Sequence, residues 1–380
     1  MRVAIVINTS WNIWNFRRGL VLALRAAGHE VLAIAPPDEY SSRLESELGC
    51  RYVPIVMENK GTNPLKDAQL TRRFLAVYKR ERPDVVLHFT IKPNIYGTLA
   101  ARLAGVPSIN NVSGLGTVFL IENLVSKVAR GLYRLAFRFP KKVFFQNNDD
   151  RELFIRYGLI RPALTGLVPG SGVDLARFRP QEGVAKAPGA PFKFLMVARV
   201  LYEKGIVEYF EAAKQVRAAL PAGAVQFQLL GALDEAGGVG VARATFEQWL
   251  AAGNIEYLGT SDNVAAHIHA ADCVVLPSYR EGTPKTLLEA AACGKPLVTT
   301  DVPGCRETVQ NGRNGYLCQV RNAADLADKL LAVAQLPPAR LAALGAASRQ
   351  LAEEKFDEKL VLSQYLAAVV EAGRPIAQAI

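Results

Sequence analysis

The segment from Cys273 to Ala290 reads CVVLPSYREGTPKTLLEA and joins an apolar run to a polar loop and a helical pattern. Residues 273–277 are continuously apolar, which is typical of a strand buried on both faces of a parallel sheet. Thr283 is predicted as the N-cap and Pro284 as the first residue of a helix that ends near residue 293. This strand, loop and helix indicate an α/β fold.

Two carboxylates flank the predicted helix start. The backbone N–H groups of Lys285 and Thr286 lie at the positive helix end, which is suited to a diphosphate. Glu281 precedes this end, and Glu289 lies about a turn and a half inside the helix. One carboxylate can meet a sugar and the other a ribose diol. In the alternative interpretation, Thr283 only caps its helix, Glu281 is exposed to solvent and Glu289 pairs with a lysine.

Apolar runs alternate with helical patterns twice along the 380 residues, which predicts two doubly wound parallel sheets. A helix is expected over residues 16–27. The strands expected in the first half are residues 3–7, 30–35, 85–89, 108–112 and 142–146. Those expected in the second half are residues 192–197, 225–230, 255–258, 273–277 and 296–300. The predicted domains are residues 1–168 and 192–354, joined by a linker over 169–191, with a C-terminal helix of about residues 355–380 that packs back on the first domain.

The composition narrows the class of protein. No stretch of 18 apolar residues lacks charge, so no membrane span is expected, and the short N-terminal apolar run is predicted to be a strand and not a secretory signal. The five cysteines have no paired short spacing, which argues against zinc and against a disulfide framework. We expect a cytoplasmic protein.

Charge is divided unevenly. Residues 1–180 hold 26 Lys and Arg against 14 Asp and Glu, whereas residues 181–380 hold 19 against 21. The basic half predicts an anionic partner: nucleic acid, a phosphorylated substrate or a membrane surface. Nucleic acid is disfavoured because no helix-turn-helix, zinc finger or aromatic-basic RNA signature is present.

Residues 127–142 form the clearest basic amphipathic pattern in the first half, because most of their Lys and Arg residues are spaced three or four apart among apolar residues. The cations are Lys127, Arg130, Arg134, Arg138, Lys141 and Lys142. Such an amphipathic helix can lie in a lipid interface, or it can be the solvated face of an ordinary core helix. Both interpretations stay open at this point.

A second pair of cations follows the predicted strand at residues 192–197. Arg199 and Lys204 lie five residues apart at the carboxyl end of this strand, where open α/β folds bind ligands. An arginine offers a planar fork to phosphate oxygens and a lysine a mobile point charge. The pair is therefore suited to a diphosphate leaving group.

These motifs together resemble the retaining GT-B glycosyltransferases of family 4. The resemblance rests on Arg199-x4-Lys204-Gly205, Ser278-x2-Glu281-Gly282, the seven residues between Glu281 and Glu289, and Gly304-x2-Glu307. It implies two Rossmann-like domains facing across a cleft, an N-terminal domain for the acceptor and a C-terminal domain for a nucleotide sugar. Family members of this kind retain the anomeric configuration and need no metal, and no cofactor is expected.

The resemblance also implies roles for these residues. Arg199 and Lys204 would bind the donor diphosphate, Glu281 would face the sugar hydroxyls and Glu289 would hold the ribose. Backbone contacts to the donor would come from Gly282, Thr283, Pro284, Lys285 and Thr286.

The first half is similar to the bacterial PglA-type subgroup, which acts on undecaprenyl-diphosphate-linked saccharides. The resemblance lies in residues 8–17, 90–97 and 113–116. It implies Arg17 and Lys92 as candidates for an acceptor phosphate and Asn15 or Asn94 for sugar hydroxyls, with Gly114 in a neighbouring loop.

Thr90 is a departure from the family pattern. Many members carry a histidine there, and a threonine cannot hold a proton at neutral pH. This position therefore predicts an unusual donor, such as a deoxy or N-acetylated sugar.

The resemblance thus implies a retaining enzyme that moves an N-acetylhexosamine from a UDP-sugar to an undecaprenyl-diphosphate-linked saccharide. It is expected to work in bacterial glycan biosynthesis, as a peripheral protein at the inner face of the cytoplasmic membrane. The alternatives are a GT-B UDP-sugar 2-epimerase and a non-catalytic glycan-assembly subunit.

Overall fold

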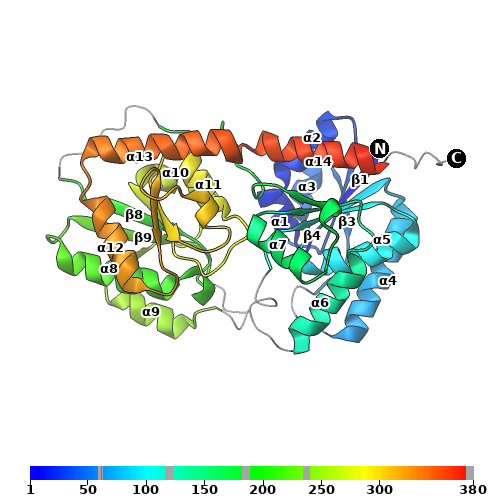
Figure 1. Cartoon of the computed structure of the whole chain (residues 1–380), viewed down its shortest axis with the longest axis horizontal. Helices are drawn as coiled ribbons and strands as arrows, with labels where there is room; N and C mark the ends of the chain where they lie inside the picture. Colours follow the sequence, from blue (N-terminus) through cyan, green and yellow to red (C-terminus); the bar gives the residue numbers. More distant parts are fainter. Residues whose placement is uncertain (59–60, 62, 116–123, 182–188, 234–239, 374–380) are drawn as a thin grey trace. The chain divides into compact units, whose positions relative to one another are not determined.

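The computed structural model describes residues 1–58, 61, 63–115, 124–181, 189–233 and 240–373. Two compact units divide the chain: Met1–Ser171 with Lys359–Ile380, and Gly172–Glu358 (Figure 1). The boundary between the two units falls between Ser171 and Gly172. The predicted linker residues 182–188 and residues 374–380 of the predicted C-terminal helix lie outside the described part.

The first unit is built on a parallel sheet of seven strands in the order β3-β2-β1-β4-β5-β6-β7. Its strands are β1 (Arg2–Val6), β2 (Glu30–Ala35), β3 (Arg51–Pro54), β4 (Val85–Phe89), β5 (Ser108–Val112), β6 (Lys142–Phe145) and β7 (Thr165–Leu167). Its helices are α1 (Ser10–Phe16), α2 (Arg18–Ala26), α3 (Ser41–Ser46), α4 (Pro64–Glu81), α5 (Thr98–Ala104), α6 (Leu124–Ala136), α7 (Asn148–Arg156) and α14 (Glu358–Gly373), with a π-helical turn η1 (Pro93–Gly97) and a 3-10 turn η3 (Pro162–Leu164).

The second unit has a parallel sheet of six strands in the order β10-β9-β8-β11-β12-β13. Its strands are β8 (Phe192–Val197), β9 (Val225–Leu230), β10 (Glu256–Tyr257), β11 (Cys273–Leu276), β12 (Leu297–Thr300) and β13 (Gly315–Cys318). Its helices are α8 (Ile206–Ala219), α9 (Arg243–Ala251), α10 (Val264–Ala270), α11 (Lys285–Ala292), α12 (Ala323–Ala334) and α13 (Pro338–Leu351), with short turns η4 (Tyr202–Lys204), η5 (Arg306–Thr308) and η6 (Ala352–Phe356).

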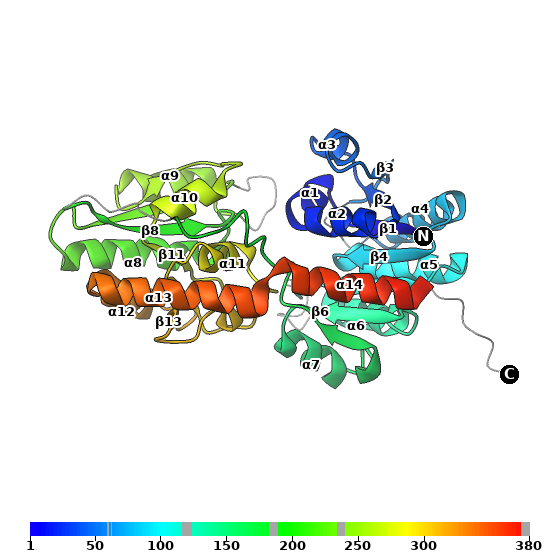
Figure 2. The same ribbon diagram turned by 90° about the horizontal axis from the view of Figure 1, so that it is seen from above.

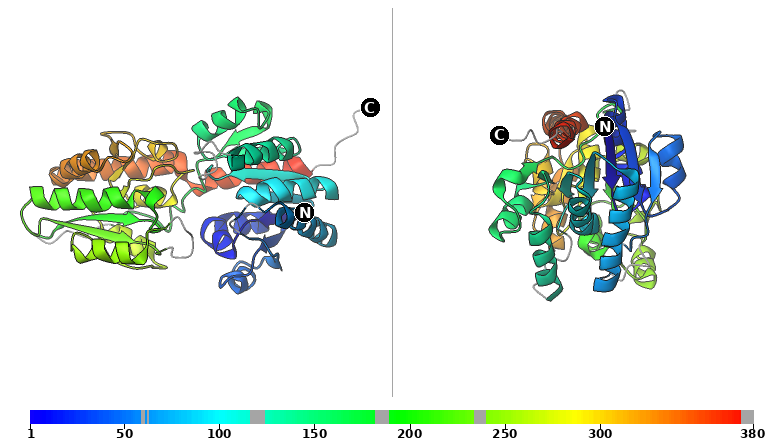
Figure 3. Two further views of the ribbon diagram at one scale, coloured as in Figure 1. Left: turned by 90° about the horizontal axis from the view of Figure 1, so that it is seen from below. Right: turned by 90° about the vertical axis from the view of Figure 1, so that its right-hand side faces the viewer.

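Two doubly wound parallel sheets confirm the predicted fold class. Helices lie on both sides of the strands within each unit, as Figure 2 and Figure 3 show. Several local expectations were wrong. The helix predicted over residues 16–27 is α2, which begins at Arg18 after a separate helix α1. The strands β3, β7 and β13 were not predicted.

Successive side chains of β1 point to opposite faces of the first sheet, where they join two separate apolar clusters. Val3 and Ile5 point to one apolar cluster, whereas Ala4 and Val6 point to the other. The first face is covered in part by α14, whose Val361 lies in the same cluster. The chain therefore needs its C-terminal helix to bury the sheet formed by its N-terminal residues.

The strand order reverses once in each sheet. In the first sheet β1 lies between β2 and β4, and in the second β8 lies between β9 and β11. At such a reversal, the chain segments that follow the two neighbouring strands cross to opposite sides of the sheet. Open α/β sheets bind ligands in the space that this leaves at the carboxyl ends of those strands. Two candidate ligand positions follow, one in each unit: after β1 and β4, and after β8 and β11.

Candidate functional site

In the second unit the loops after β8 and β11 contact each other at the strand reversal. The loop after β8 carries Arg199 and Lys204, and the loop after β11 carries Glu281. A backbone hydrogen bond of 2.9 Å from Tyr279 N–H to the Glu203 carbonyl joins the two loops. Lys204 and Glu281, 77 positions apart, are thereby brought to one edge of the sheet.

Lys204 and Glu281 form an ion pair at this edge. The Lys204 Nζ lies 2.5 Å from Glu281 Oε1, and the two side chains are 17% and 15% exposed. The hydroxyl of Ser278 donates to the same carboxylate oxygen over 2.7 Å. Ser278 is itself fully buried, and its carbonyl accepts from the Thr300 hydroxyl on β12. The carboxylate of Glu281 is thus held in one orientation, which contradicts the alternative that it is solvated.

Two glycines let the loops approach each other. Gly205 has φ +73°, and a Cβ there would lie 2.0 Å from the Pro277 carbonyl oxygen. Gly304 has φ +84°, and its Cβ would lie 2.3 Å from the carbonyl oxygen of Glu281. Both positions require glycine, because a side chain would collide with backbone and adopt an unfavourable left-handed conformation. The glycines in the Lys204-Gly205 and Gly304-x2-Glu307 motifs therefore have a packing cause.

The predicted N-cap of α11 was wrong by one residue. The N-cap is Pro284 and not Thr283, and it makes no side-chain capping bond. Pro284 has an extended ψ of 111°, which delays the helix to Lys285. Lys285 and Thr286 still supply the first backbone N–H groups of the helix, as predicted for a diphosphate cradle.

Glu289 is buried a little more than one turn inside α11. The residue is 8% exposed, and Lys285 Nζ lies 3.9 Å from its Oε1. Burial raises the pKa of the Glu289 carboxyl, and the charges of Lys285 and Arg177 oppose that rise. The lysine contact of the alternative interpretation is therefore present, but in a buried setting.

The remaining predicted donor residues lie in the loops after β8 and β11 or in the first turn of α11. Gly282 and Pro284 are buried, whereas Thr283, Lys285 and Thr286 are partly exposed. Arg199 is exposed, and its backbone carbonyl accepts the Leu201 N–H over 2.8 Å.

In the first unit the strand reversal lies between β1 and β4, and Arg17 and Thr90 follow these strands. Arg17 occupies the junction of α1 and α2 and is 5% exposed. Its guanidinium carbon lies 4.3 Å from the ring centre of Phe89, the last residue of β4. The two predicted positions are therefore neighbours at the carboxyl edge of this sheet.

Thr90 has φ +67°, which is rare for a β-branched residue. Its hydroxyl donates to the Phe89 carbonyl over 2.5 Å. Strain of this kind persists only where the surrounding structure enforces it, and it gathers at functional sites. The sequence could single out Thr90 only by its departure from the family pattern.

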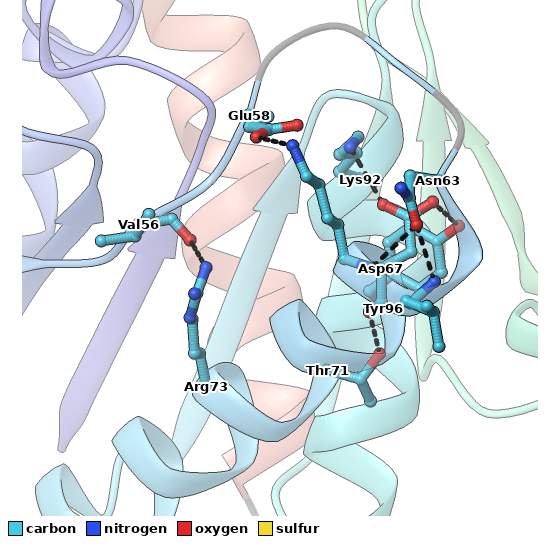
Figure 4. Close-up of polar contacts among 10 residues, drawn as sticks. Val56, Glu58, Asn63, Asp67, Thr71, Arg73, Lys92 and Tyr96 are labelled. Carbon is cyan, nitrogen blue, oxygen red and sulfur yellow. Dashed lines mark hydrogen bonds and ion pairs between the residues drawn. The ribbon is translucent and has the colours of Figure 1, made fainter.

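Lys92 lies in a polar cluster with residues from α4 (Figure 4). Its Nζ lies 2.9 Å from Asp67 Oδ1, and the Tyr96 hydroxyl donates to Asp67 Oδ2 over 2.9 Å. The side chains of Lys92 and Asp67 are 15% and 10% exposed. Asp67, which the sequence did not indicate, therefore neutralises Lys92, and this weakens the prediction that Lys92 binds an acceptor phosphate.

The prediction for Asn94 needs correction. Asn94 is 1% exposed, and its amide donates to the Asn111 carbonyl on β5 over 2.8 Å. Its own backbone carbonyl accepts from the side chain of Asn110. A side chain tied into the sheet in this way has almost no surface to offer to a sugar, so we assign Asn94 to the fold.

His88 on β4 belongs to the same buried network. Its Nε2 lies 2.9 Å from the Tyr78 hydroxyl, and its Nδ1 lies 3.4 Å from Asn110 Oδ1. Burial lowers the pKa of His88 to about 3. The imidazole is therefore neutral and supports the start of the segment that carries Thr90 and Lys92.

Asn15 and Gly114 are the last two residues that were predicted to contact the acceptor. The amide of Asn15 donates to the Trp11 carbonyl one turn earlier in α1, over 3.0 Å. Gly114 has φ +136° and follows β5, while Gly116 of the same motif lies outside the described residues. These two positions lie on separate elements that follow different strands of the sheet.

The basic stripe over residues 127–142 begins in α6. Two of its arginines contact the end of α7: Arg130 lies 4.7 Å over the Tyr157 ring, and Arg134 donates to the Tyr157 carbonyl over 2.9 Å. Other members of the stripe lie on the surface beside apolar side chains. The exposed cations of the stripe are Lys127, Arg134, Arg138 and Lys141, and the exposed apolar residues are Val128, Leu135 and Phe139. Part of the stripe is thus structural, and part is available at the surface.

Three further properties concern the part of the chain that the structure describes. No group of three or more His, Cys, Asp or Glu lies close enough together to hold a metal ion. No single helix is long and apolar enough to cross a membrane, although Ala323–Ala334 and Pro338–Phe356, bent by 112°, pass that test as a pair. All five cysteines are buried as free thiols.

Family comparisons agree with this arrangement. A family model described as group 1 glycosyl transferases matches residues 191–335, and a glycosyl transferase 4-like domain model matches residues 13–170. The chain is 30% identical over 381 residues to an N,N'-diacetylbacillosaminyl-diphospho-undecaprenol alpha-1,3-N-acetylgalactosaminyltransferase of Campylobacter jejuni, covering 96% of this chain and 97% of that protein. It is 26% identical over 302 residues to a UDP-Gal:alpha-D-GlcNAc-diphosphoundecaprenol alpha-1,3-galactosyltransferase of Escherichia coli, covering 76% of each.

Solved structures share the fold. Anabaena HepE in complex with UDP and glucose matches with a TM-score of 0.78 and 18% identity over 98% of this chain and 99% of that one. Sucrose-phosphate synthase of Thermosynechococcus elongatus matches with a TM-score of 0.81 and 20% identity over 98% of each chain.

Proposed function

The chain belongs to the group 1, family 4 glycosyltransferases of the GT-B fold, and from this premise we propose that it transfers an N-acetylhexosamine from a UDP-sugar to an undecaprenyl-diphosphate-linked saccharide. The observation that carries the proposal is the identity of 30% over nearly the full length of an enzyme with such an acceptor in its name. A second relative named for a diphosphoundecaprenol acceptor supports the same class of acceptor.

The donor is proposed to bind at the strand reversal of the second unit. Arg199 and Lys204 would contact the diphosphate together with the first backbone N–H groups of α11, where a helix end favours anions. Glu281 would accept hydrogen bonds from sugar hydroxyls, because Lys204 and Ser278 already fix its orientation. Glu289 would hold the ribose diol. Gly282, Thr283 and Pro284, which follow Glu281 in the chain, would supply backbone contacts to the donor.

The reaction is proposed to retain the anomeric configuration. The acceptor hydroxyl oxygen forms a bond to the anomeric carbon on the face from which the diphosphate departs, and the bond from that carbon to the diphosphate oxygen breaks. The acceptor proton passes to the departing phosphate oxygen. The negative charge that develops on the diphosphate is stabilised by Lys204 and Arg199, and preorganised cations at that position lower the barrier. No metal is required in this scheme.

The acceptor is proposed to bind to the first unit, with Arg17 at a phosphate and Thr90 near the transferred sugar. Asn15 and Gly114 remain candidates for contacts with the saccharide. We further propose that the protein associates peripherally with the inner face of the cytoplasmic membrane. The exposed part of the basic stripe over residues 127–142 supports this membrane association, since cations beside apolar side chains favour an anionic lipid surface.

The assay that tests the function measures UDP release from UDP-N-acetylhexosamines with and without an undecaprenyl-diphosphate saccharide. We expect release that depends on the acceptor, with a saccharide longer by one sugar as the second product and an α linkage from an α donor. An inverted linkage would contradict retention. Interconversion of the donor without any acceptor would indicate a 2-epimerase, and donor binding without turnover over a panel of acceptors would indicate a non-catalytic subunit.

Membrane association has its own test. Co-sedimentation with anionic phospholipid vesicles should fall with rising salt, and Val128→Ser with Phe139→Ser should reduce it. Equal binding to neutral vesicles would contradict an electrostatic contribution.

A further inference from the structure

Arg17 is a buried cation for which the described residues provide no carboxylate partner. Its guanidinium makes one hydrogen bond, from Nη1 to the Phe16 carbonyl over 3.1 Å, and lies over the Phe89 ring. The Nε is buried and has no hydrogen-bond partner within the described part of the chain. Burial lowers the pKa of this guanidinium, and the neighbouring Tyr365 only partly offsets that effect.

Lys92 in the same unit shows how a largely buried cation is normally held. Its ammonium pairs with the carboxylate of Asp67 over 2.9 Å. A buried charge without a partner is costly, and proteins normally pair it or let it bind an ion. The described residues therefore leave the charge of Arg17 without a counter-charge, which a bound anion would supply.

The position of Arg17 also favours an anion. Arg17 is the N-cap of α2, a helix of nine residues, and makes no side-chain capping bond. The first backbone N–H groups of that helix, at the positive end of its dipole, follow directly after Arg17 in the chain. The site lies at the strand reversal between β1 and β4, where this kind of sheet binds ligands. Both the fixed charge and the backbone donors suit a phosphate group.

We propose that Arg17 and the N-terminus of α2 form a phosphate-binding site that holds the diphosphate of the lipid-linked acceptor. This inference rests on the proposed function, because that function supplies an acceptor with a diphosphate. It assigns acceptor recognition to Arg17 and not to Lys92, whose charge Asp67 already neutralises. Arg17 is a binding residue and takes no part in the bond changes at the anomeric carbon.

The first experiment needs no turnover. Thermal unfolding is measured with and without inorganic pyrophosphate for the native protein, Arg17→Met, Arg17→Lys and the matched control Arg102→Met. Arg102 is an exposed arginine on α5 of the same unit and lies 5.7 Å from the Phe139 ring centre, so its loss removes the same charge away from the proposed site. Pyrophosphate should raise the Tm of the native protein and of Arg102→Met by about 2 °C or more, and leave Arg17→Met unchanged.

The ligand-free proteins give an independent readout. Without an anion, Arg17→Met should unfold at a higher temperature than the native protein, because the change removes a buried charge that has no partner. Arg17→Lys keeps the charge and should not gain stability. A lower Tm for Arg17→Met than for Arg17→Lys would mean that the guanidinium is already satisfied inside the unit, and would overturn the proposal. Stabilisation of Arg17→Met by pyrophosphate equal to that of the native protein would also overturn it.

Steady-state kinetics then show whether the site holds the diphosphate of the acceptor or that of the donor. With lipid-linked acceptor, Arg17→Met should raise the KM for the acceptor by about tenfold or more, while the KM for the UDP-sugar stays within about twofold. A raised KM for the UDP-sugar with an unchanged acceptor KM would show that the site holds the donor diphosphate and would overturn the assignment. If the native protein transfers nothing to any acceptor, the proposed function fails, whereas the pyrophosphate measurements still decide whether Arg17 binds phosphate.

Discussion

The ammonium of Lys204 lies 2.5 Å from the carboxylate of Glu281, although 77 residues separate the two in the chain. Neither residue contributes to the apolar core, and a partly buried ion pair is weak evidence of a role in stability alone. The pair joins the loops of two adjacent strands at the reversal of the sheet. We interpret it as a cation and a carboxylate that are positioned before the donor binds.

A double-mutant cycle on this pair tests that interpretation. Lys204→Met and Glu281→Gln should each lower the free energy of unfolding by about 1–3 kcal/mol, because each removes one partner of a partly buried ion pair. The double variant should recover most of that loss. Each single variant and the double variant should lower kcat by about 10²-fold or more, since the developing charge and the sugar contacts are both lost. Denaturant unfolding and a UDP-release assay measure the two effects.

The control for this cycle is the exposed pair of Arg243 and Glu247 on α9, whose side chains are both 62% exposed. Arg243→Met should change stability by about 0.5 kcal/mol or less and leave transfer intact. If the double variant recovered activity as well as stability, the proposed roles of Lys204 and Glu281 in donor binding would be contradicted.

The close approach of Gly205 to Pro277 gives a second prediction. Gly205→Ala places a Cβ 2.0 Å from the Pro277 carbonyl oxygen at φ +73°, so the loop that carries Lys204 must move. We expect a loss of about 3 kcal/mol or more in unfolding free energy, with transfer abolished. Denaturant unfolding and the UDP-release assay measure both effects.

Gly223 in the same unit is the matched control for Gly205. It has φ +79°, and no atom lies within 4 Å of the position that its Cβ would occupy. Gly223→Ala should therefore cost only about 1 kcal/mol and keep activity. Equal losses for the two variants would mean that the contact with Pro277 is unimportant.

Glu289 predicts a dependence of stability on pH. Its folded pKa is raised above 4.5 by burial, so its contribution to stability is present below pH 4.5 and is lost as the pH rises through the raised pKa. Glu289→Gln, which cannot ionise, should therefore be more stable than the native protein at pH 7 and gain nothing at pH 4. It should also bind UDP-sugars more weakly if Glu289 holds the ribose. Thermal unfolding over this pH range decides the first point, and a stability difference that stays constant with pH would contradict it.

Local patterns predicted the second unit well, because its strands are apolar runs and its charged residues follow directly after them. Arg199, Lys204 and Glu281 could be placed at the carboxyl ends of strands in this way. The capping of α11 could not, because Thr283 is a good N-cap by type and only the extended ψ of Pro284 excludes it. The contact of Lys204 with Glu281 depends on the strand order, which no local signal contains.

The first unit was harder to predict for the same reason. Asp67 neutralises Lys92 across 25 positions, and the Asn111 amide donates to the Tyr365 hydroxyl across 254. Such partners are visible only after the sheet and α14 are assembled. Burial likewise weakens the prediction that Asn94 contacts sugar hydroxyls, because this residue lies in a π-helical turn and its amide donates to the Asn111 carbonyl on β5.

His88 predicts an acid-sensitive first unit. Its pKa falls from 6.5 to about 3 on burial, so the stability that it contributes is present above pH 6.5 and is lost as the pH falls toward 3. One proton taken up on unfolding gives a slope of about 1.4 kcal/mol per pH unit in that window. His88→Gln keeps polar contacts but cannot be protonated, so its stability should fall less steeply between pH 6 and pH 4. Denaturant unfolding at several pH values measures the two slopes, and parallel slopes would contradict a buried neutral imidazole.

The backbone of Thr90 yields the last prediction, which separates strain from function. A β-branched residue at φ +67° is strained, so Thr90→Gly should stabilise the unit by about 1 kcal/mol after the entropy of glycine in the unfolded chain is counted. Arg82, which ends α4 at φ 47° and is exposed, is a matched control in the same unit. Arg82→Gly should give a similar gain in Tm and leave transfer unchanged, whereas Thr90→Gly should lower kcat/KM and relax the preference among UDP-sugars. Selectivity that survives Thr90→Gly would show that the strained segment has a structural role, and that the choice of sugar depends on other residues.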